Sequence, residues 1–537
     1  MPMEPVDTGS DAPPLRAVRW AVLAAVLPFL LLVWRFEFVC DDAFISFRYA
    51  RHLAEGAGLR FNPGDHTPVE GYSNLLWVLL LAPFELFGFD VTLAARALGT
   101  ASSLALIALV TRFAVRTLQL GTVAAIVTAL FLGTLPPLVV WSTGGLETAL
   151  FSLLLMGVVA GLLETPEAPR TRVAATCAAL AELTRTDGWV WVGIVLAAAG
   201  VVAWLATPDA KRRAALLRAA WITLVVLALT TLAHTGFRFA YHGDVVSNTV
   251  RAKGLMQPER GLMYVTGTAL AVPSMLVAAA LGLAGLVRRQ RRVALAAGVA
   301  VVLGTTYVAL PGGDFMTMGR LLVPLMPALA LLLASGLQAG FARGGLRALI
   351  ALGLAACAIA LSLTSAFDVH LVPRSVRERF AFRGNTGVYE TEVEMWRSMR
   401  DRAQLWSLQG RALGLYTKEG ESMIGYAIGA IGYYSDLFLY DGFGLVDRDV
   451  ARVPPDQGVS TGHARVVTPE FFFPKQPTYY SATLVDRRTP AGAGLGVTNF
   501  TQSALSTQVR IERHALPPNS GFPPGVELRL YRFTLWD

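Results

Sequence analysis

The sequence predicts an all-α polytopic membrane domain followed by a small C-terminal α+β domain. Of its 537 residues, 54% are hydrophobic and only 16% are charged, whereas soluble domains carry roughly 25% charged residues. Several apolar runs approach or exceed the roughly 20 residues that a helix needs to cross a bilayer. The last run ends near residue 367, so we expect a cytoplasmic tail over 1–16, a membrane domain over 17–367 and a periplasmic soluble domain over 368–537.

The apolar runs predict about 11 transmembrane helices. They cover residues 17–36, 92–113, 120–140, 146–163, 172–186, 188–206, 218–237, 263–287, 293–310, 320–341 and 346–367. The run 75–88 is too short to cross and contains Pro83 and Glu85, which predicts an amphipathic or re-entrant helix at the membrane interface. In the tail, the stretch 422–449 predicts a helix, a strand and a turn.

The distribution of charge predicts the orientation. With the N-terminus in the cytoplasm, the turns expected inside are basic and the loops expected outside are acidic, which is the positive-inside pattern. The inside turns hold Arg112, Arg116, Arg170, Arg172, Lys211, Arg212, Arg213, Arg218, Arg288, Arg289, Arg291, Arg292, Arg343 and Arg347. The net charge of +8 is therefore typical of cytoplasmic anchoring, and we expect no nucleic-acid partner. The three cysteines lie far apart and indicate neither a disulfide framework nor a metal motif.

Two adjacent acids, Asp41 and Asp42, follow the first span in the stretch FVCDDAFISFRYARHLAEGAGL. Apolar residues recur after them near helical spacing, and the pattern stops at Gly56, which predicts an amphipathic helix on the outer surface with interfacial character. One aspartate suits the N-cap of that helix. The other is a candidate general base, since a carboxylate in a partly desolvated cleft can accept a proton from a reacting hydroxyl.

The other outer loops are long and polar, and loops held by a rigid scaffold often carry functional residues. Candidate substrate-binding residues are Glu70, Tyr72, Asn74, Glu147, Asp187, His242, Asp244, Asn248 and Asp314. Because these loops lie on one side of the membrane, we expect them to share a pocket at the outer face.

Several of these residues also have a purely structural explanation. Tyr72 suits an aromatic belt, and Glu147 suits the first turn of a helix. Glu182 and Arg185 are three residues apart and can form an ion pair. The cations of 237–254 suit anchoring to lipid headgroups, and 310–324 suits a tight turn closed by a salt bridge between Asp314 and Arg320.

Several of these stretches together resemble the membrane-embedded GT-C glycosyltransferases, closest to the group that contains the terminal β-arabinofuranosyltransferase of the actinobacterial cell wall. The stretches are DDAFISFRYARHL, VEGYSNLLW, STGGLETALF, LTRTDG, YHGDVVSNTVRAKG, GGDFMTMGRLLVP and GAIGYYSDLFLYDGFGLVD, with Gly462 and His463 further on. The resemblance covers residues from about 35 to 465, and the tail is shorter than in the wall arabinosyltransferases.

The resemblance implies a GT-C-like fold and an inverting glycosyltransferase. Such an enzyme moves a sugar from a polyprenyl-phosphate donor to a cell-envelope glycan or glycolipid at the periplasmic face of the bacterial inner membrane, among membrane lipids. It implies that Asp41 or Asp42 is the catalytic base. Candidates for the donor phosphate are, in order, Arg251, Lys253, Arg48 and Arg320. No cofactor is predicted, and a divalent metal is compatible with adjacent acids but is not assigned.

Two other classes of protein remain alternatives. A transporter or flippase for a lipid-linked sugar would place charged residues within its spans and near the midplane of the membrane. A non-catalytic assembly protein of envelope glycans would bind carbohydrate through its tail and would tolerate replacement of Asp41 and Asp42. The donor sugar, the acceptor, the linkage and the oligomeric state are left open by the sequence.

Overall fold

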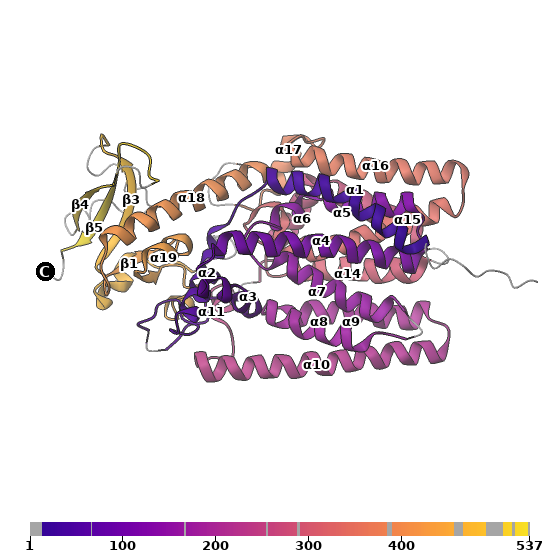
Figure 1. Ribbon diagram of the computed structural model, residues 1–537, viewed down its shortest axis with the longest axis horizontal. Helices are drawn as coiled ribbons and strands as arrows, with labels where there is room; N and C mark the ends of the chain where they lie inside the picture. The colour runs from indigo at the N-terminus through magenta and orange to yellow at the C-terminus, as the bar shows by residue number, and fades with distance from the viewer. Residues whose placement is uncertain are drawn as a thin grey trace, which may run out of the picture.

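The computed structural model describes residues 13–65, 67–165, 168–253, 256–286, 290–383, 389–455, 465–489, 509–517 and 521–534. A bundle of long helices carries a small β-sheet at one end, which we call the sheet end (Figure 1). Four residues named above, Arg288, Arg289, Gly462 and His463, lie outside the described residues.

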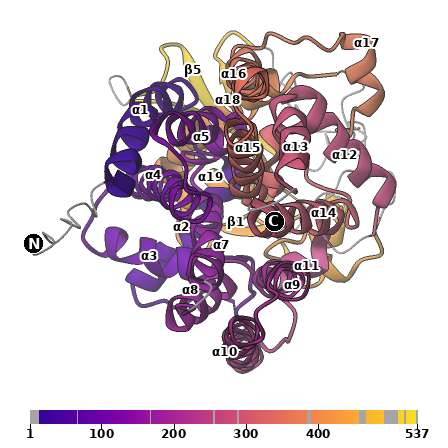
Figure 2. The same ribbon diagram turned by 90° about the vertical axis from the view of Figure 1, so that its right-hand side faces the viewer.

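Each of the expected spans has a helix in the described part of the bundle. The helices are α1 (Pro13–Arg35), α4 (Val91–Leu118), α5 (Thr122–Thr134), α7 (Thr148–Leu163), α8 (Thr171–Thr184), α9 (Gly188–Ala206), α10 (Ala210–His242), α12 (Pro258–Ala271), α13 (Ser274–Leu283), α14 (Arg291–Ala309), α15 (Met326–Phe341) and α16 (Gly345–Ala366). Within the described residues, 7 helices are long and apolar enough to cross a membrane alone, or 8 if the bent pair α12–α13 is one span. Helix α10 lies at the rim of the bundle, beside α8 and α9 (Figure 2).

Two expected spans are not continuous helices. The span over 120–140 is interrupted at Leu135, where α5 ends and the short α6 (Pro136–Trp141) begins. The span over 263–287 is bent by 93° between α12 and α13. Both interruptions occur next to a proline, Pro136 or Pro273, because proline lacks the amide hydrogen that an uninterrupted helix needs and restricts the residue before it. The prediction of two uninterrupted spans was wrong for this reason.

Close approach of backbones holds the helices together, as expected where lipid removes most of the hydrophobic driving force. A Cβ on Gly336 of α15 would lie 2.2 Å from the carbonyl oxygen of Leu281 in α13. A Cβ on Gly161 of α7 would lie 2.8 Å from the amide nitrogen of Ala174 in α8. The small residues therefore set the spacing of these two helix pairs.

Three short helices form a layer at the sheet end of the bundle: α2 (Asp41–Ala54), α3 (Leu75–Leu86) and α11 (Asn248–Lys253). The helix expected after Asp41 is α2, and the positive φ of Gly56 (83°) accompanies its end. The short helix expected over 75–88 is α3. Helix α2 differs from the expected surface helix because most of its residues are buried, beneath the C-terminal segment that packs on it.

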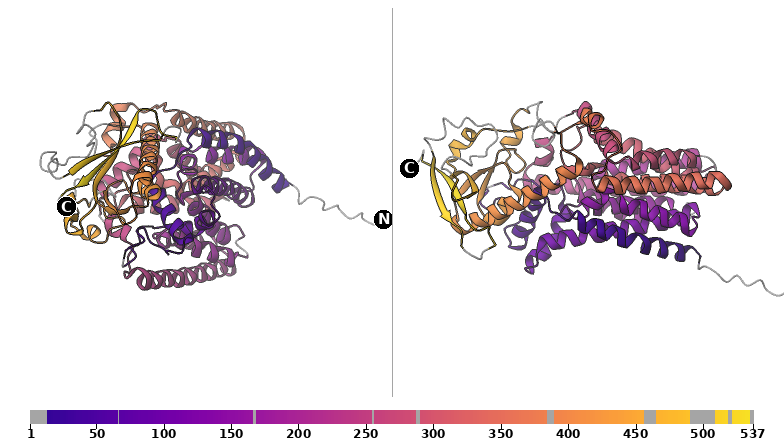
Figure 3. Two further views of the ribbon diagram at one scale, coloured as in Figure 1. Left: turned by 60° about the vertical axis from the view of Figure 1, so that its left-hand side comes forward. Right: turned by 90° about the horizontal axis from the view of Figure 1, so that it is seen from above.

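The C-terminal segment extends from the bundle through the long helix α18, which runs to the sheet (Figure 3). Its elements are α17 (Arg374–Arg377), η4 (Glu378–Phe380), α18 (Glu392–Tyr416), β1 (Ser422–Gly425), α19 (Gly429–Ser435), β2 (Phe438–Asp441), η5 (Val450–Arg452), η6 (Pro469–Lys475), β3 (Tyr479–Asp486), β4 (Val509–Ala515) and β5 (Val526–Phe533). The sheet has the order β2-β1-β3-β5-β4. Strand β1 is parallel to β2 and β3, whereas β5 is antiparallel to β3 and β4. The stretch 422–449 is therefore β1, α19 and β2 followed by a turn, so the expected helix, strand and turn are present and the strand β1 that precedes them was not predicted.

Candidate active site

A cavity of about 480 Å³ lies where the short helices meet the bundle. Its walls come from α2, from the loops before α3, α7 and α9, from α11, and from the segment between α14 and α15. Eight of the predicted site residues line it: Asp42, Tyr72, Asn74, Glu147, Asp187, Lys253, Asp314 and Arg320. The expectation that distant polar loops share one pocket is therefore met for these eight residues.

The structure separates the two adjacent aspartates. Asp42 lines the cavity. The Asp41 carboxylate accepts hydrogen bonds from the backbone amides of Gly429 (3.2 Å) and Ala430 (2.8 Å), at the start of α19. The N-cap of α2 is Cys40, so neither aspartate caps its own helix as expected. Asp41 instead satisfies amide donors at the beginning of a helix in the C-terminal segment.

Burial dominates the titration of Asp41. Desolvation raises the pKa of its carboxyl to about 7, although the hydrogen bond from Ala430 lowers the pKa. The neighbouring charge of Asp42 raises the pKa further. An Asp41 carboxylate is thus costly in the folded state even with two amide donors, because a buried charge loses the solvation of water.

Two cations face the cavity near Asp314. The Nε atom of Arg320 donates to Asp314 at 2.7 Å, and this confirms the salt bridge expected for that turn. Burial alone would raise the pKa of Asp314, but Arg320 and Lys253 together lower it. Within the described residues, Lys253 makes no ion pair, and the two Nη atoms of Arg320 have no hydrogen-bond acceptor. These donors are therefore available to an anion in the cavity.

A network of polar side chains forms another wall. The Asn74 amide donates to Glu147 at 2.8 Å and accepts from the Ser46 hydroxyl of α2 at 3.1 Å. Arg185 lies between two acids, with a nitrogen–oxygen distance of 3.3 Å to Glu147 and 2.8 Å to Asp187. Burial opposes ionisation of Asp187, but Arg185 outweighs burial and lowers the pKa of Asp187.

The network ends at Tyr307, near the last turn of α14. Its hydroxyl donates to Asp187 at 3.0 Å. The partner expected for Arg185 was Glu182, but Glu182 faces His234 of α10, at 3.8 Å from its Nδ1 atom. That expectation was wrong because Arg185 is in an extended conformation after the end of α8, so its side chain leaves the helical i,i+3 geometry.

The other predicted site residues lie outside the cavity lining. Arg251 forms an ion pair with Asp244 (2.7 Å), and Glu70 forms one with Arg238. His242 contacts the Tyr72 hydroxyl (3.0 Å) and the Pro68 carbonyl (3.1 Å).

Two of these residues bind the C-terminal segment instead. The Asn248 amide donates to the carbonyls of Gly444 and Leu445. Arg48 is completely buried, stacks on Phe61 (4.4 Å) and donates to the carbonyl of Leu437. Asn248 and Arg48 therefore support the structure around the cavity, and neither of them lines it.

Among the lining residues that were absent from the predicted site are Ser46, Arg185 and Tyr307. The serine lies on the helix face that carries Asp42, four positions away, so helical spacing could have identified it. Tyr307 lies near the C-terminal end of an apolar run, where a tyrosine is indistinguishable in sequence from a belt residue. Arg185 was assigned to a local ion pair.

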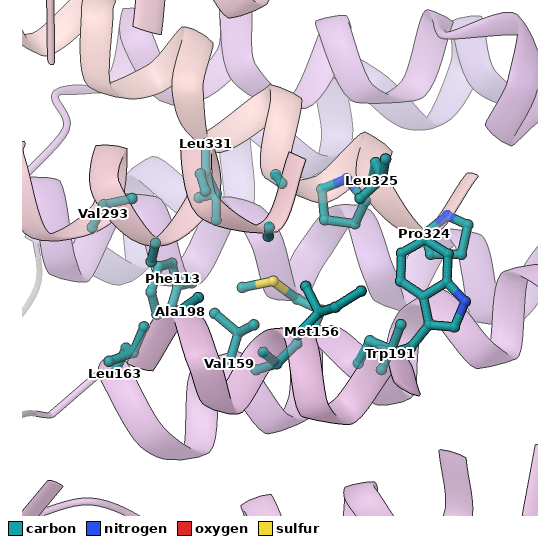
Figure 4. Close-up of a pocket in the computed structure, with 18 residues that line it drawn as sticks. Phe113, Met156, Val159, Leu163, Trp191, Ala198, Val293, Pro324, Leu325 and Leu331 are labelled. Atoms are coloured by element: carbon teal, nitrogen blue, oxygen red, sulfur yellow. The ribbon is translucent and has the colours of Figure 1, made fainter. Parts of the chain in front are cut away.

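An apolar cavity of about 60 Å³ lies deeper in the bundle, with Phe113, Met156, Trp191, Leu325 and Leu331 among its lining residues (Figure 4). Trp191 connects the two cavities, because its ring lines the apolar one while its Nε1 atom donates to Asp187 at 3.2 Å.

Within the described residues, no group of three or more His, Cys, Asp or Glu side chains is placed to hold a metal ion.

The polar cavity, with the apolar cavity beside it, is suited to a group-transfer reaction. A carboxylate, Asp42, can accept a proton, and the cations Lys253 and Arg320 can stabilise an anionic leaving group in the same cavity. Asp42 and Arg320 both line this cavity.

Comparison with known proteins gives matches at two levels. Residues 394–516 match a domain of unknown function, DUF8728. No curated protein sequence matches the chain significantly. The match covers most of α18 and the strands β1 to β4.

Solved structures resemble nearly the whole chain. ArnT from Cupriavidus metallidurans, bound to undecaprenyl phosphate, has a TM-score of 0.53 at 15% identity, covering 96% of this chain and 98% of ArnT. The apo oligosaccharyltransferase of Archaeoglobus fulgidus has a TM-score of 0.51 at 13% identity, covering 88% and 69%. The arabinofuranosyltransferase AftD from Mycobacteria has a TM-score of 0.48 at 17% identity, covering 95% and 41%. The matches to ArnT and to the apo oligosaccharyltransferase show that the helical bundle with its small C-terminal sheet domain has a GT-C fold.

Proposed function

We propose that this protein is an inverting glycosyltransferase that moves a sugar from a polyprenyl-phosphate donor to a cell-envelope glycan or glycolipid. The observation that carries the proposal is the single cavity in which the Asp42 carboxylate and the cations Lys253 and Arg320 meet. ArnT supports it, since that structure has the same fold and was solved with undecaprenyl phosphate bound. The motif resemblance described above favours arabinofuranose as the sugar.

In the proposed reaction Asp42 is the general base. It accepts the proton of an acceptor hydroxyl as the hydroxyl oxygen attacks the anomeric carbon. The bond between that carbon and the phosphate oxygen breaks on the opposite face, so the configuration inverts. Asp41 is excluded from this role in the proposal because its carboxylate is occupied by the amides of α19.

The leaving polyprenyl phosphate gains negative charge, and Lys253 and Arg320 stabilise it. This order replaces Arg251 as the first candidate, since Arg251 is paired with Asp244 outside the cavity lining. Glu147, Asp187 and Asn74 offer acceptors and donors to sugar hydroxyls. Trp191 borders both this site and the apolar cavity, and the proposal places the start of the isoprenoid chain beside it.

The orientation and domain boundaries are part of the same proposal. The basic turns of the bundle lie at the end far from the sheet, and we place that end in the cytoplasm of a bacterial inner membrane. Residues 17–367 then form the catalytic membrane domain, and 368–537 form a periplasmic domain. A transporter is disfavoured, because in the described spans the buried charged side chains lie toward helix ends, whereas transporters place them near the midplane.

Transfer of a radiolabelled sugar tests the proposal. Purified protein in lipid nanodiscs receives a labelled polyprenyl-phosphate arabinofuranose or hexose and an arabinan or glycolipid acceptor. We expect transfer by the wild type and a loss of about 10²–10⁴-fold in rate for Asp42→Asn, the range for removal of a general base.

Two matched variants make the result specific. Asp401→Asn makes the same change on the exposed side of α18 and should retain the wild-type rate. Asp41→Asn keeps an acceptor oxygen for the α19 amides and should lose far less activity than Asp42→Asn. If Asp42→Asn, folded like the wild type, transfers sugar at the wild-type rate, Asp42 is not the base.

A further inference from the structure

The segment that carries Arg320 into the cavity has an unusual backbone. In η3 (Thr317–Leu325), Met318 and Gly319 both have positive φ angles, 52° and 56°. Glycine adopts this conformation easily, but a methionine side chain does so only when its surroundings impose it. Met318 is also 1% exposed. We call Thr317–Arg320 the Arg320 turn, and its shape requires an external constraint.

Glu392, the first residue of α18, supplies that constraint. Its carboxylate accepts a hydrogen bond from the backbone amide of Met318. The Thr317 hydroxyl also donates to Glu392, whose main-chain carbonyl oxygen lies at 2.5 Å and whose Oε2 atom lies at 3.1 Å. The side chain of Glu392 is only 7% exposed. A hydrogen bond from a backbone amide to a buried carboxylate is among the stronger ones in proteins.

Arg383 closes the same arrangement from the other side. It donates to both carboxylate oxygens of Glu392, at 3.0 Å and 2.8 Å, and to the carbonyls of Phe315 and Met316. The Trp141 indole donates to the Thr317 carbonyl at 2.9 Å. The Arg320 turn is thereby held at consecutive backbone positions by residues from the C-terminal segment and α6.

The contacts of Glu392 and of Asp41 involve the same continuous part of the chain. Glu392 begins α18, α18 packs against α19, and α19 donates its first amides to Asp41 beside the proposed base. One continuous piece of the C-terminal segment therefore touches both the wall that carries Asp42 and the turn that carries Arg320.

We infer that Glu392 is a positioning residue that fixes the Arg320 turn, so that the C-terminal segment sets the geometry of the phosphate-binding side of the cavity. This inference rests on the proposed function, in which Arg320 binds the donor phosphate. Glu392 does not line the cavity and acts only through the turn.

Phosphate binding by the full-length protein in nanodiscs tests the inference, with farnesyl phosphate as the probe and farnesol as its uncharged control. Glu392→Ala should weaken farnesyl phosphate binding by about 10- to 100-fold, the loss expected for one hydrogen bond to a charged group. Glu392→Gln keeps an acceptor oxygen for the Met318 amide and should weaken binding less. Asp401→Asn on the same helix should bind like the wild type.

A second background shows whether Glu392 acts through Arg320. In an Arg320→Gln protein, the additional Glu392→Ala change should weaken binding by less than about twofold, because the coupled residue is already lost. In a Lys253→Gln protein, the Glu392→Ala effect should keep its full size. Equal effects of Glu392→Ala in the wild-type and Arg320→Gln backgrounds would overturn the inference.

A cryo-EM map of Glu392→Gln, and of Glu392→Ala if it folds, shows the conformation of the Arg320 turn directly. We expect Met318 to leave the left-handed conformation in at least the alanine variant, or both variants to lose density for the Arg320 side chain. An unchanged turn in every variant that folds would overturn the inference, whether or not the wild type binds phosphate. Absence of sugar transfer by the wild type would instead contradict the proposed function.

Discussion

Asp41 and Asp42 are adjacent in sequence but have different surroundings, because successive residues of a helix point roughly 100° apart. One carboxylate meets the amides of α19 and the other faces the cavity. The sequence identified the pair as exceptional, and local pattern could not assign the two roles. The partner of Asp41 is 388 positions away along the chain, a distance that no helical periodicity spans.

The raised pKa of Asp41 predicts a specific pH dependence of stability. Since its pKa rises from 3.8 when unfolded to about 7 when folded, the folded state binds more protons between these values. Stability should therefore fall as pH rises from about 4 to 7. Asp41→Asn removes the titrating group, so its apparent melting temperature should depend less on pH across this window than that of the wild type.

Thermal unfolding in one detergent between pH 4 and pH 8 measures this difference. Asp401→Asn, on an exposed surface, should follow the wild-type curve. Parallel curves for the wild type and Asp41→Asn would contradict the assignment of a strongly desolvated carboxyl to Asp41.

Helix α19 docks on α2 through its backbone, and this contact depends on a missing side chain. A Cβ on Gly429 would lie 2.0 Å from the Asp41 carbonyl oxygen and 2.8 Å from its carboxyl carbon. In the sequence, Gly429 and Gly432 form only a lone Gly-x-x-Gly pattern, which is a weak signal. The structure assigns Gly429 to close approach, which the sequence could not show without knowing that α2 lies opposite.

Gly429→Ala should therefore separate α19 from α2. Overpacking of this kind costs typically about 1–3 kcal/mol, so we expect a clearly lower melting temperature together with reduced transfer. Gly353→Ala is the matched control, because a Cβ at Gly353 meets nothing within 4 Å. It should be neutral or slightly stabilising in its helix. Equal melting temperatures for the two variants would show that α19 does not pack closely on α2.

At the scale of the whole molecule, the sequence predicts those features that depend on residues close together in the chain. Hydrophobic length gives the helices, and prolines mark the breaks once they are considered, as at Pro136 and Pro273. The cavity depends on long-range contacts that the pattern does not contain. Arg48 and Asn248 carry the charge and polarity of ligand-binding residues, yet both bind backbone carbonyls of the C-terminal segment.

The C-terminal segment is thus part of the frame of the cavity. It binds α2 through Asp41, Arg48 and Arg51, and it binds the Arg320 turn through Glu392. Its match to a domain of unknown function covers the region that makes most of these α2 contacts. We expect the membrane domain to need this segment for a correctly shaped site.

A cryo-EM map of the wild-type protein in lipid nanodiscs with a non-hydrolysable polyprenyl-phosphonate sugar tests the proposed mechanism most directly. We predict that the phosphonate lies within hydrogen-bond distance of Lys253 and Arg320, with the anomeric carbon facing Asp42 and the isoprenoid chain entering the bilayer beside Trp191. A phosphonate bound at the opposite end of the bundle, or at the sheet end but away from Asp42, would contradict it.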